Sequence, residues 1–378
     1  MLFPDFSQLS VEVIFFASLA FALICKISLL FFRYSKLAFY KAPTDNTFNK
    51  PVSVVICARN EGENLTKFLP EILTQDYHEF EVVVVNDCSY DNTDDVLREF
   101  AKVFPNLKAI TVKEDEYYKH GKKFALLVGI KGAKYEHLVL TDADCKPASS
   151  LWLKKMASGF SNGKEIVLGY GAYFQEKGFL NKLIRYDTFL IGLKYLSAAL
   201  RKKPYMGVGR NLAYTKDLFF RSKNFSKHYH LISGDDDLFI NQVATADNTT
   251  IVIDHEAITY SEPKHSLKNW KMQKGRHLTT APYYKQSTKM MLGIDIFVNF
   301  IFWIFAISCL VLESTRISSG IGLMLIIFSE YLILIKASKK LNEKNLVSFY
   351  PILDIFLILL YPIFHLNKKI FQSGKWMN

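Results

Sequence analysis

The sequence predicts a mixed α/β domain of Rossmann-like type, flanked on both sides by helices that span a membrane. Long apolar runs lie near both ends of the 378-residue chain, and short aliphatic runs alternate with amphipathic stretches between them. Mixed charge and 15% aromatic residues exclude an intrinsically disordered chain. We expect an N-terminal anchor (1–40), a cytosolic α/β domain (41–285) and a C-terminal membrane region (286–378).

The first apolar run, residues 11–32, is interrupted by Lys26. At about 1.5 Å per residue, a helix of this length crosses the roughly 30 Å hydrocarbon layer. The run is too long for a signal peptide and lacks a basic start and a small-residue cleavage site. We therefore expect a retained membrane anchor.

Three further apolar runs, residues 294–312, 317–335 and 346–366, lie in the C-terminal region. The first two are expected to span the membrane. The last run contains two prolines and two polar residues, Pro351, Asp354, Pro362 and His365. It is therefore either a third span of this region or a re-entrant or interfacial segment.

Lysine and arginine residues next to the apolar runs predict the orientation. Arg33, Lys36 and Lys41 follow the first run, Lys285 and Lys289 precede the second, and Lys336, Lys339, Lys340 and Lys344 follow the third. This pattern predicts that the central domain faces the cytosol, and we favour the cell inner membrane as its location. Three lysines after the last run conflict with this pattern if that run spans (Lys368, Lys369 and Lys375). The sequence leaves this conflict open.

Three short aliphatic runs, residues 52–57, 81–85 and 137–141, have the pattern of buried parallel strands. Helical stretches are expected at residues 64–73, 93–103 and 122–134. Strands that alternate with helices form right-handed βαβ units, whose ligands bind outside the carboxyl ends of the strands. Polar loops follow all three runs, at residues 58–62, 86–93 and 141–144. We expect these loops to line one crevice, although Asp91 and Asn92 are equally explained as helix caps.

Two carboxylates, Asp142 and Asp144, follow the third strand, and Asp87 follows the second. Neighbouring carboxylates beside a buried strand repel one another and favour a bound cation. Hard oxygen ligands select Mg²⁺ or Mn²⁺, and these ions keep positions open for phosphate oxygens. The pattern therefore predicts a metal-assisted diphosphate site.

Six motifs in order resemble the family 2 glycosyltransferases, which are inverting enzymes of GT-A fold that use nucleotide sugars. They are PVSVVICARNE (51–61), VND (85–87), GKKFAL (121–126), TDAD (141–144), GDDD (234–237) and QKGR (273–276). The resemblance covers about residues 51–281. The flanking membrane segments are similar to those of the ceramide glucosyltransferase type and its bacterial relatives.

The resemblance implies a role for each matching residue. Asp87 would bind the nucleotide base, and Ala58 and Glu61 would enclose the nucleoside. Asp144 would hold the metal with Asp142 beside it. Donor contacts are also expected from Lys123, Gln273 and Arg276, and a UDP-sugar is the favoured donor. His277 stands where the family usually has tryptophan, which leaves the acceptor uncertain.

The 234–237 loop is expected to supply the base that takes the proton of the acceptor. We favour Asp236, with Asp235 as the alternative, and interpret Asp237 as a cap for a helix over residues 238–246. A second metal site is a less favoured interpretation. The glycine-rich segment 207–214 is expected to line the sugar pocket, or to be a backbone turn without a ligand role.

Residues 178–205 mix apolar and basic side chains, which predicts an amphipathic helix at the bilayer surface. A buried helix with extended lysines is the alternative. Together the features favour transfer of a sugar from a nucleotide-diphosphate donor to a lipid or lipid-linked acceptor. A processive polysaccharide synthase subunit and a non-enzymatic nucleotide-binding scaffold are the alternatives.

Two other classes of protein are disfavoured. The net charge of +11 permits nucleic-acid binding, but the basic residues cluster beside the spans. Five scattered cysteines without a Cys-x-x-Cys pair are not typical of a zinc ribbon, an iron–sulfur site or a disulfide scaffold.

Overall fold

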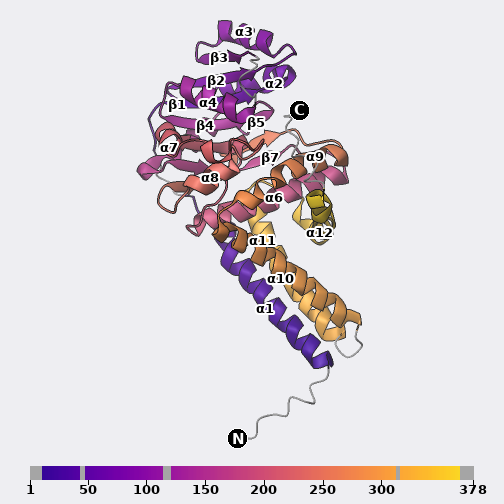
Figure 1. Ribbon diagram of the computed structural model, residues 1–378. Coiled ribbons are helices and arrows are strands. Elements are labelled where there is room, and N and C mark those ends of the chain that lie inside the picture. Colours follow the sequence, from indigo (N-terminus) through magenta and orange to yellow (C-terminus); the bar gives the residue numbers. More distant parts are fainter. Residues whose placement is uncertain (1–10, 43–46, 114–120, 312–315, 367–378) are drawn as a thin grey trace.

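The computed structural model describes residues 11–42, 47–113, 121–311 and 316–366, and the structural statements below concern these residues. An α/β domain carries three long helices that project from it side by side (Figure 1). The lysines whose position conflicted with a fourth span, Lys368, Lys369 and Lys375, lie outside the described residues.

The domain is built on a seven-stranded sheet of order β3-β2-β1-β4-β8-β6-β9. Its strands are β1 (Val52–Ala58), β2 (Phe80–Asp87), β3 (Leu107–Val112), β4 (His137–Asp142), β6 (Ile166–Leu168), β8 (Leu212–Thr215) and β9 (Thr249–Ile251). Strands β3, β2, β1 and β4 are parallel, as the alternating pattern predicted. Strand β8 runs antiparallel to both β4 and β6.

Helices cover the sheet and leave the parallel strands β1, β2 and β4 buried on both faces. The first three are α2 (Gly62–Leu73), α3 (Thr93–Val103) and α4 (Lys122–Gly132). Gly129 of α4 lies so close to the sheet that a Cβ there would come within 2.7 Å of Val55 and 3.0 Å of Val85. The absence of a side chain therefore allows α4 to pack directly on β1 and β2.

A smaller three-stranded sheet lies beside the main one, with order β5-β10-β7. Its strands are β5 (Cys145–Pro147), β7 (Gly171–Tyr173) and β10 (Thr259–Ser261). The remaining helices of the domain are α5 (Trp152–Ser158), α6 (Phe179–Leu200), α7 (Lys216–Arg221), α8 (Asp237–Val243) and α9 (Leu267–Leu278). Helix α8 is shorter than the expected helix 238–246 and starts one residue earlier.

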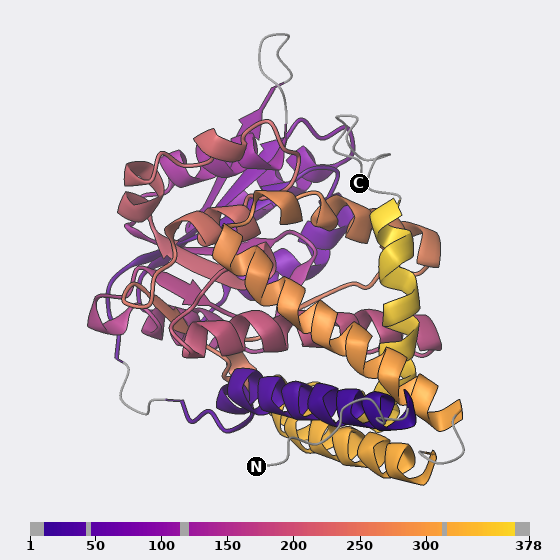
Figure 2. The same ribbon diagram turned by 60° about the horizontal axis from the view of Figure 1, so that its bottom comes forward.

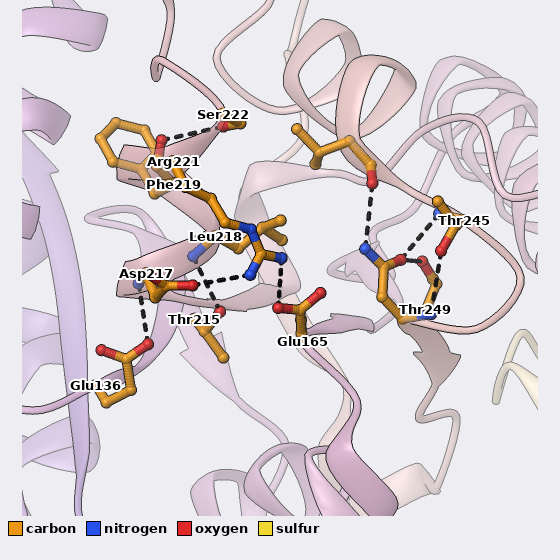
Figure 3. A network of polar contacts seen from close by, with 12 residues as sticks. Glu136, Glu165, Thr215, Asp217, Leu218, Phe219, Arg221, Ser222, Thr245 and Thr249 are labelled. Atoms are coloured by element: carbon orange, nitrogen blue, oxygen red, sulfur yellow. Dashed lines mark hydrogen bonds and ion pairs between the residues drawn. The ribbon is translucent and has the colours of Figure 1, made fainter.

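Polar contacts fix α7 at the edge of the sheet where β4 begins (Figure 3). Arg221 forms ion pairs with Glu165 at 2.5 Å and with Asp217 at 2.8 Å. The backbone N–H of Asp217 donates to Glu136 over 2.9 Å, and that of Leu218 to the Thr215 hydroxyl over 3.3 Å. This edge is opposite to the one where Asp142 ends β4.

Helix α6 buries most of its apolar side chains within the protein. Leu183, Ile184 and Leu193 are at most 3% exposed, and Leu190 is half-buried against the same core. The helix packs between the small sheet on one side and the membrane helices on the other. The bilayer-surface helix over residues 178–205 stays a prediction, and the burial of these side chains favours the alternative of a buried helix.

Within the described residues, four helices are long and apolar enough to cross a membrane. They are α1 (Val11–Ala38), α10 (Gln286–Val311), α11 (Arg316–Lys340) and α12 (Tyr350–Leu366). Helices α1, α10 and α11 pack against one another, with Leu19, Ala22, Phe302, Ala306 and Ile326 in their shared core. Each predicted apolar run therefore corresponds to one helix.

Buried ion pairs join α1 to its two neighbours. Lys26 lies 3.1 Å from Glu330 of α11, and its ammonium group is 4.5 Å from the centre of the Phe302 ring. Arg33 pairs with Asp295 of α10, which also accepts a hydrogen bond from Tyr34 over 3.3 Å. A lone charge in hydrocarbon is costly, so the interruption of the first apolar run by Lys26 is explained by its partner.

Candidate active site

The carboxyl ends of β1, β2 and β4 meet at one edge of the main sheet. Cys57 lies opposite Asp142 in the β1–β4 pair, and Ala58 lies opposite Asn86 in the β1–β2 pair. The polar loops after the three strands therefore share one edge, as parallel topology requires. Ala58 and Asp87, expected at the nucleoside, are fully buried at these strand ends.

Hydrogen bonds tie the first two loops together. Asp91 accepts from the backbone N–H of Gly62 and from that of Thr93, both over 3.0 Å. The Asn60 side chain accepts from the Tyr90 N–H over 2.8 Å. These bonds hold Glu61 in place, where burial raises its pKa to about 7 and Asn64 donates to it over 2.6 Å. Asp91 thus links the loop after β1 to the loop after β2 by hydrogen bonds.

Asp142 and Asp144 lie close together with Cys145, and one potential ligand atom from each lies within 4.8 Å of the others. Burial raises the pKa of Asp144, and the neighbouring Asp142 carboxylate raises it further. Burial acts in the same direction on Asp142, but Lys122, Arg210 and Arg276 hold the pKa of Asp142 below its ordinary value. The pair therefore carries concentrated negative charge.

Lys122 is the cation that contacts these acids. Its ammonium group lies 2.7 Å from Asp142 and 3.4 Å from Asp235, and these carboxylates raise its pKa well above the ordinary value against the effect of burial. Lys123, expected as a donor contact, is buried outside the cavity lining and donates to the carbonyls of His228 and Leu231. Adjacent residues on a helix point about 100° apart, so only one of the two lysines faces the acids.

The 234–237 loop brings three more carboxylates to this edge. Asp236 accepts from the backbone N–H groups of Gly209 and Asp237, each over 2.7 Å. Burial, with Asp235 and Asp237 nearby, raises the pKa of Asp236 to about 7. A carboxyl with this pKa is half ionised near neutral pH, which is suited to a general base.

Asp237 differs from Asp236 because side-chain hydroxyl groups donate to its carboxylate. Thr280 donates to it over 2.5 Å and Tyr284 over 2.7 Å, and the Leu238 N–H donates over 2.7 Å. These contacts join α8 to the segment that leads into α10. Asp237 is the first residue of α8 and Asp236 is its N-cap, so the expectation that Asp237 caps this helix is wrong, and Asp237 instead anchors α8 to the membrane region.

Helix α9 contributes the late motif. Gln273, Arg276 and His277 line the same cavity as the acids, and Gln273 donates to the Tyr173 hydroxyl over 3.1 Å. Enclosure and the neighbouring Arg276 and Lys274 hold the pKa of His277 well below its ordinary value. His277 is thus a neutral side chain on the wall where the family usually has tryptophan.

Arg210 is a further cavity residue that the motif analysis did not single out. Its guanidinium lies 4.2 Å from the centre of the Tyr173 ring and donates to the Ala172 carbonyl over 3.1 Å. It lowers the pKa of both Asp142 and Asp144. Its place in the glycine-rich segment 207–214 was the available signal.

One cavity of about 1380 Å³ connects these groups. It contains Glu61, Asp142, Asp144, Asp235, Asp236, Gln273 and Arg276 on its wall, so the structure brings together seven of the predicted site residues. It continues past Lys194 of α6 to side chains of two apolar helices. These are Ile296, Asn299, Phe300 and Trp303 of α10 and Leu357, Ile358 and Tyr361 of α12.

The acid pair fits a hard divalent cation. Asp144 and Asp142 offer carboxylate oxygens close together, and burial raises the pKa of Asp144 because its charge is poorly solvated there. The Cys145 thiol contacts the Ser261 hydroxyl at 3.1 Å, and burial raises its pKa, which keeps it protonated. An oxygen-ligated Mg²⁺ or Mn²⁺ suits this donor set better than a thiolate-bound metal.

Comparison with known proteins agrees with this geometry. Residues 53–221 match the family model described as glycosyl transferase family 2. The chain is 31% identical over 191 residues to "Glycosyltransferase AglE" of Haloferax volcanii, a match that covers 49% of this chain and 58% of that protein. It is 34% identical over 93 residues to the poly-beta-1,6-N-acetyl-D-glucosamine synthase of Staphylococcus epidermidis, covering 25% and 21%. The matches thus span at most about three fifths of these two relatives.

A solved structure has a similar fold. The mannosyltransferase PcManGT from Pyrobaculum calidifontis, in complex with GDP-Man and Mn²⁺, is 19% identical and superposes with a TM-score of 0.57. The match covers 89% of this chain and 100% of that one. It supports the predicted GT-A fold with flanking apolar helices.

Proposed function

We propose, from the family 2 glycosyltransferase domain that this chain carries, that it moves a sugar from a nucleotide-diphosphate donor, with inversion, to a lipid or lipid-linked acceptor. The observation that supports this most is the single cavity that joins the acids Asp142, Asp144 and Asp236 to apolar side chains of α10 and α12. A polar donor end and an apolar acceptor end within one cavity are suited to a reaction between a soluble donor and a membrane-held acceptor.

Asp236 acts as the general base. The acceptor hydroxyl oxygen forms a bond to the anomeric carbon while its proton passes to the Asp236 carboxylate. The bond from that carbon to the diphosphate breaks on the opposite face, and the nucleoside diphosphate leaves. The pKa of about 7 supports this role, because the group is available in its ionised form at neutral pH and accepts a proton readily.

Cationic groups of the chain face the leaving diphosphate. Arg276 and Arg210 line the cavity beside the acids, and a guanidinium matches phosphate oxygens in a planar, bidentate way. Asp144 and Asp142 would hold Mg²⁺ or Mn²⁺, which when bound supplies positive charge to the diphosphate. Asp87, Ala58 and Glu61 are assigned to the nucleoside, and UDP is the favoured nucleotide. Of the three, Glu61 lines the cavity, whereas Ala58 and Asp87 are buried at the strand ends behind it.

The acceptor is held at membrane level. Trp303 and Phe300 of α10 and Ile358 of α12 line the cavity and are suited to an apolar chain. Bound there, the acceptor reaches the base in a restricted orientation, which replaces a three-dimensional encounter. Lysine and arginine residues beside α1, α10 and α11 support a cytosolic domain in the cell inner membrane, on the side where nucleotide sugars are made.

The full chain in proteoliposomes tests this proposal. Labelled UDP-sugars and GDP-sugars are supplied with membrane lipids and Mn²⁺, and the label is followed into organic-extractable product. We expect label in the lipid fraction, in the opposite anomeric configuration to the donor, and its loss on addition of chelator. Transfer to a water-soluble acceptor at an equal rate without lipid would contradict the lipid acceptor.

A processive polysaccharide synthase is the second candidate, favoured by the match to the Staphylococcus epidermidis synthase. The same assay separates the two, because a synthase gives a product that grows with time. A transferase gives one product of fixed size.

A further inference from the structure

We infer that α12 does not cross the membrane but lies on the membrane surface, so that the C-terminus is on the same side as the glycosyltransferase domain. By length and composition alone α12 is a candidate span, as are α1, α10 and α11. The contacts at its two ends separate it from those three helices.

The segment that leads into α12 is attached to the domain. The Lys339 carbonyl contacts the His255 ring nitrogen at 2.8 Å, and Asn342 donates to the Tyr260 hydroxyl over 3.0 Å. Glu343 is buried, where it pairs with Arg185 of α6 at 2.7 Å. The chain is therefore on the domain side of the membrane at Glu343, seven residues before α12 begins.

The last turns of α12 return to the same domain. Tyr361 donates to Asp187 of α6 over 2.6 Å, and Asp187 pairs with Lys274 of α9 at 2.6 Å. The Phe364 ring packs edge-on against Trp270 of α9, with 5.1 Å between centroids. Helix α9 also carries Gln273 and Arg276 of the cavity, so this end of α12 lies on the domain side as well. A helix that spans would have its two ends on opposite sides.

The direction of α12 agrees with these contacts. Figures 1 and 2 show α1, α10 and α11 projecting from the domain, whereas α12 lies beside α9 and crosses the direction of α1 and α11. Its packing partners in the described chain are chiefly α9, α6 and the short turn before it.

One face of α12 needs an apolar partner outside the protein. Ile352, Phe356, Leu359 and Ile363 recur at helical spacing and are 43–63% exposed, while Leu353, Leu357 and Phe364 form the buried face. The bilayer is the occupant, because Ile358 of α12 lines the same cavity as Ile296 and Phe300 of α10, and all three are exposed apolar side chains. Burial of such a face in the interfacial region gives stable binding.

The placement also resolves the charge pattern. A spanning α12 would place Lys368, Lys369 and Lys375 on the opposite side from Lys336, Lys339, Lys340 and Lys344. A helix in the membrane plane keeps all seven on one side, as the positive-inside rule favours.

Single added cysteines in the full chain test the side of the C-terminus. Asn378→Cys reports the C-terminus, Ser226→Cys the domain, and Arg316→Cys the start of α11. Each is labelled with a membrane-impermeant maleimide in inside-out and right-side-out vesicles, and labelled peptides are identified by mass spectrometry, so the native cysteines can stay. We expect Asn378→Cys to label with Ser226→Cys and opposite to Arg316→Cys. Labelling together with Arg316→Cys would overturn the inference.

The outcomes separate this inference from the proposed function on which its membrane orientation rests. If Ser226→Cys and Asn378→Cys both label from outside, the cytosolic orientation is wrong but the placement of α12 stands. If Asn378→Cys labels on the far side while transfer to lipid proceeds, the placement is wrong and the function stands.

Spin labels measure the depth of α12 directly. Labels at Ile352→Cys, Leu359→Cys and Ile363→Cys should all report one shallow depth from oxygen and nickel-chelate accessibility. Labels at Ile296→Cys, Ile304→Cys and Val311→Cys of α10, which are exposed, should report depths that change along the helix. Depths on α12 that change as they do on α10 would overturn the inference. Low accessibility to both agents with spin–spin broadening would also overturn it, because a second copy would then cover the face.

Discussion

Acidic side chains gather at both ends of β4, and the two groups differ in how their charge is balanced. At the start of β4, the edge cluster (Glu136, Glu165, Asp217 and Arg221) is built from ion pairs and a backbone hydrogen bond at the surface. At the end of β4, the cavity cluster (Asp142, Asp144, Asp235 and Asp236) shares Lys122, which contacts Asp142 and Asp235.

This difference in charge balance indicates which of the two clusters has a chemical role. Asp217 and Arg221 are 65% and 49% exposed, so water screens their attraction and the pair contributes little to stability. Burial raises the pKa of Asp144, and that of Asp236 to about 7, because their charge is neither solvated nor fully paired. Shifted pKa values of several acids in one cavity indicate a functional site, whereas the edge cluster holds α7 in place.

Asp144→Asn should have the largest effect, because it removes one of the two carboxylates placed for the divalent cation. We expect transfer to fall by at least about 1,000-fold, which is the scale of losing a principal electrostatic stabiliser. Asp217→Asn in the edge cluster is the matched control and should change the rate less than about twofold. Equal losses in the two variants would remove the distinction between the clusters.

Asp236→Asn removes the base but keeps the shape of the side chain. The turnover number should fall by about 10² to 10⁴, while the affinity for donor changes little. Asp237→Asn is the control within the same loop. It weakens the contacts to Thr280 and Tyr284, so it should lower the melting temperature more than the rate. A normal turnover number in Asp236→Asn would transfer the role to Asp235.

Lys122→Gln removes the cation that the cavity acids share. Because Asp142 and Asp235 would then repel the diphosphate, we expect kcat/KM for donor to fall by about 10- to 100-fold. Lys123→Gln changes the neighbouring lysine, which holds the carbonyls of His228 and Leu231, and should chiefly reduce stability. Steady-state kinetics and thermal unfolding of both variants check this difference. If Lys123→Gln lowered kcat/KM and Lys122→Gln chiefly reduced stability, Lys123 would again be the expected donor contact.

The pH profile should reveal the base. Asp236 accepts a proton only when it is ionised, so activity should rise about tenfold from pH 5 to pH 6 and level off above pH 7. Glu61, whose pKa burial also raises to about 7, is the competing group. The Glu61→Gln variant should keep the profile, and loss of the profile in that variant would assign the titration to Glu61.

Arg221→Gln tests the edge cluster and should have the smallest effect. Its partners Glu165 and Asp217 lie at the surface, so the free energy of unfolding should fall by less than about 1 kcal/mol. Denaturant unfolding measures this change. A loss of activity together with unchanged stability would show that the edge cluster has a functional role, which contradicts its interpretation as a purely structural cluster.

The sequence was sufficient to predict the parallel core and the membrane segments, because buried strands and long apolar helices leave unbroken hydrophobic runs. The edge strand β3 was missed, since its residues Lys108, Ala109 and Thr111 are exposed or half-buried and form no such run. The strands on the other side of β4 have three or four residues each and pair through distant segments, antiparallel at β8 and parallel between β6 and β9.

The candidate site was predictable where a motif fixes a backbone position, as at Asp142 and Asp144. It was not predictable where the rotation of a helix about its axis decides which side chain faces the cavity, as between Lys122 and Lys123. The environment of helix α6 was not predictable because its mixed composition is the same for a bilayer surface and for a buried position between two layers. Only tertiary contacts, such as the Asp187–Lys274 pair, distinguish the two.

Binding of Mn²⁺ to the full chain tests the central claim, that the cavity cluster holds a cation for the donor diphosphate. Free Mn²⁺ is followed by electron paramagnetic resonance in the presence of UDP, for the unmodified chain, Asp144→Asn and Asp217→Asn. We predict one tightly bound ion in the unmodified chain and in Asp217→Asn, and at least a tenfold weaker affinity in Asp144→Asn. Equal binding in all three, with full transfer in excess chelator, would contradict the account.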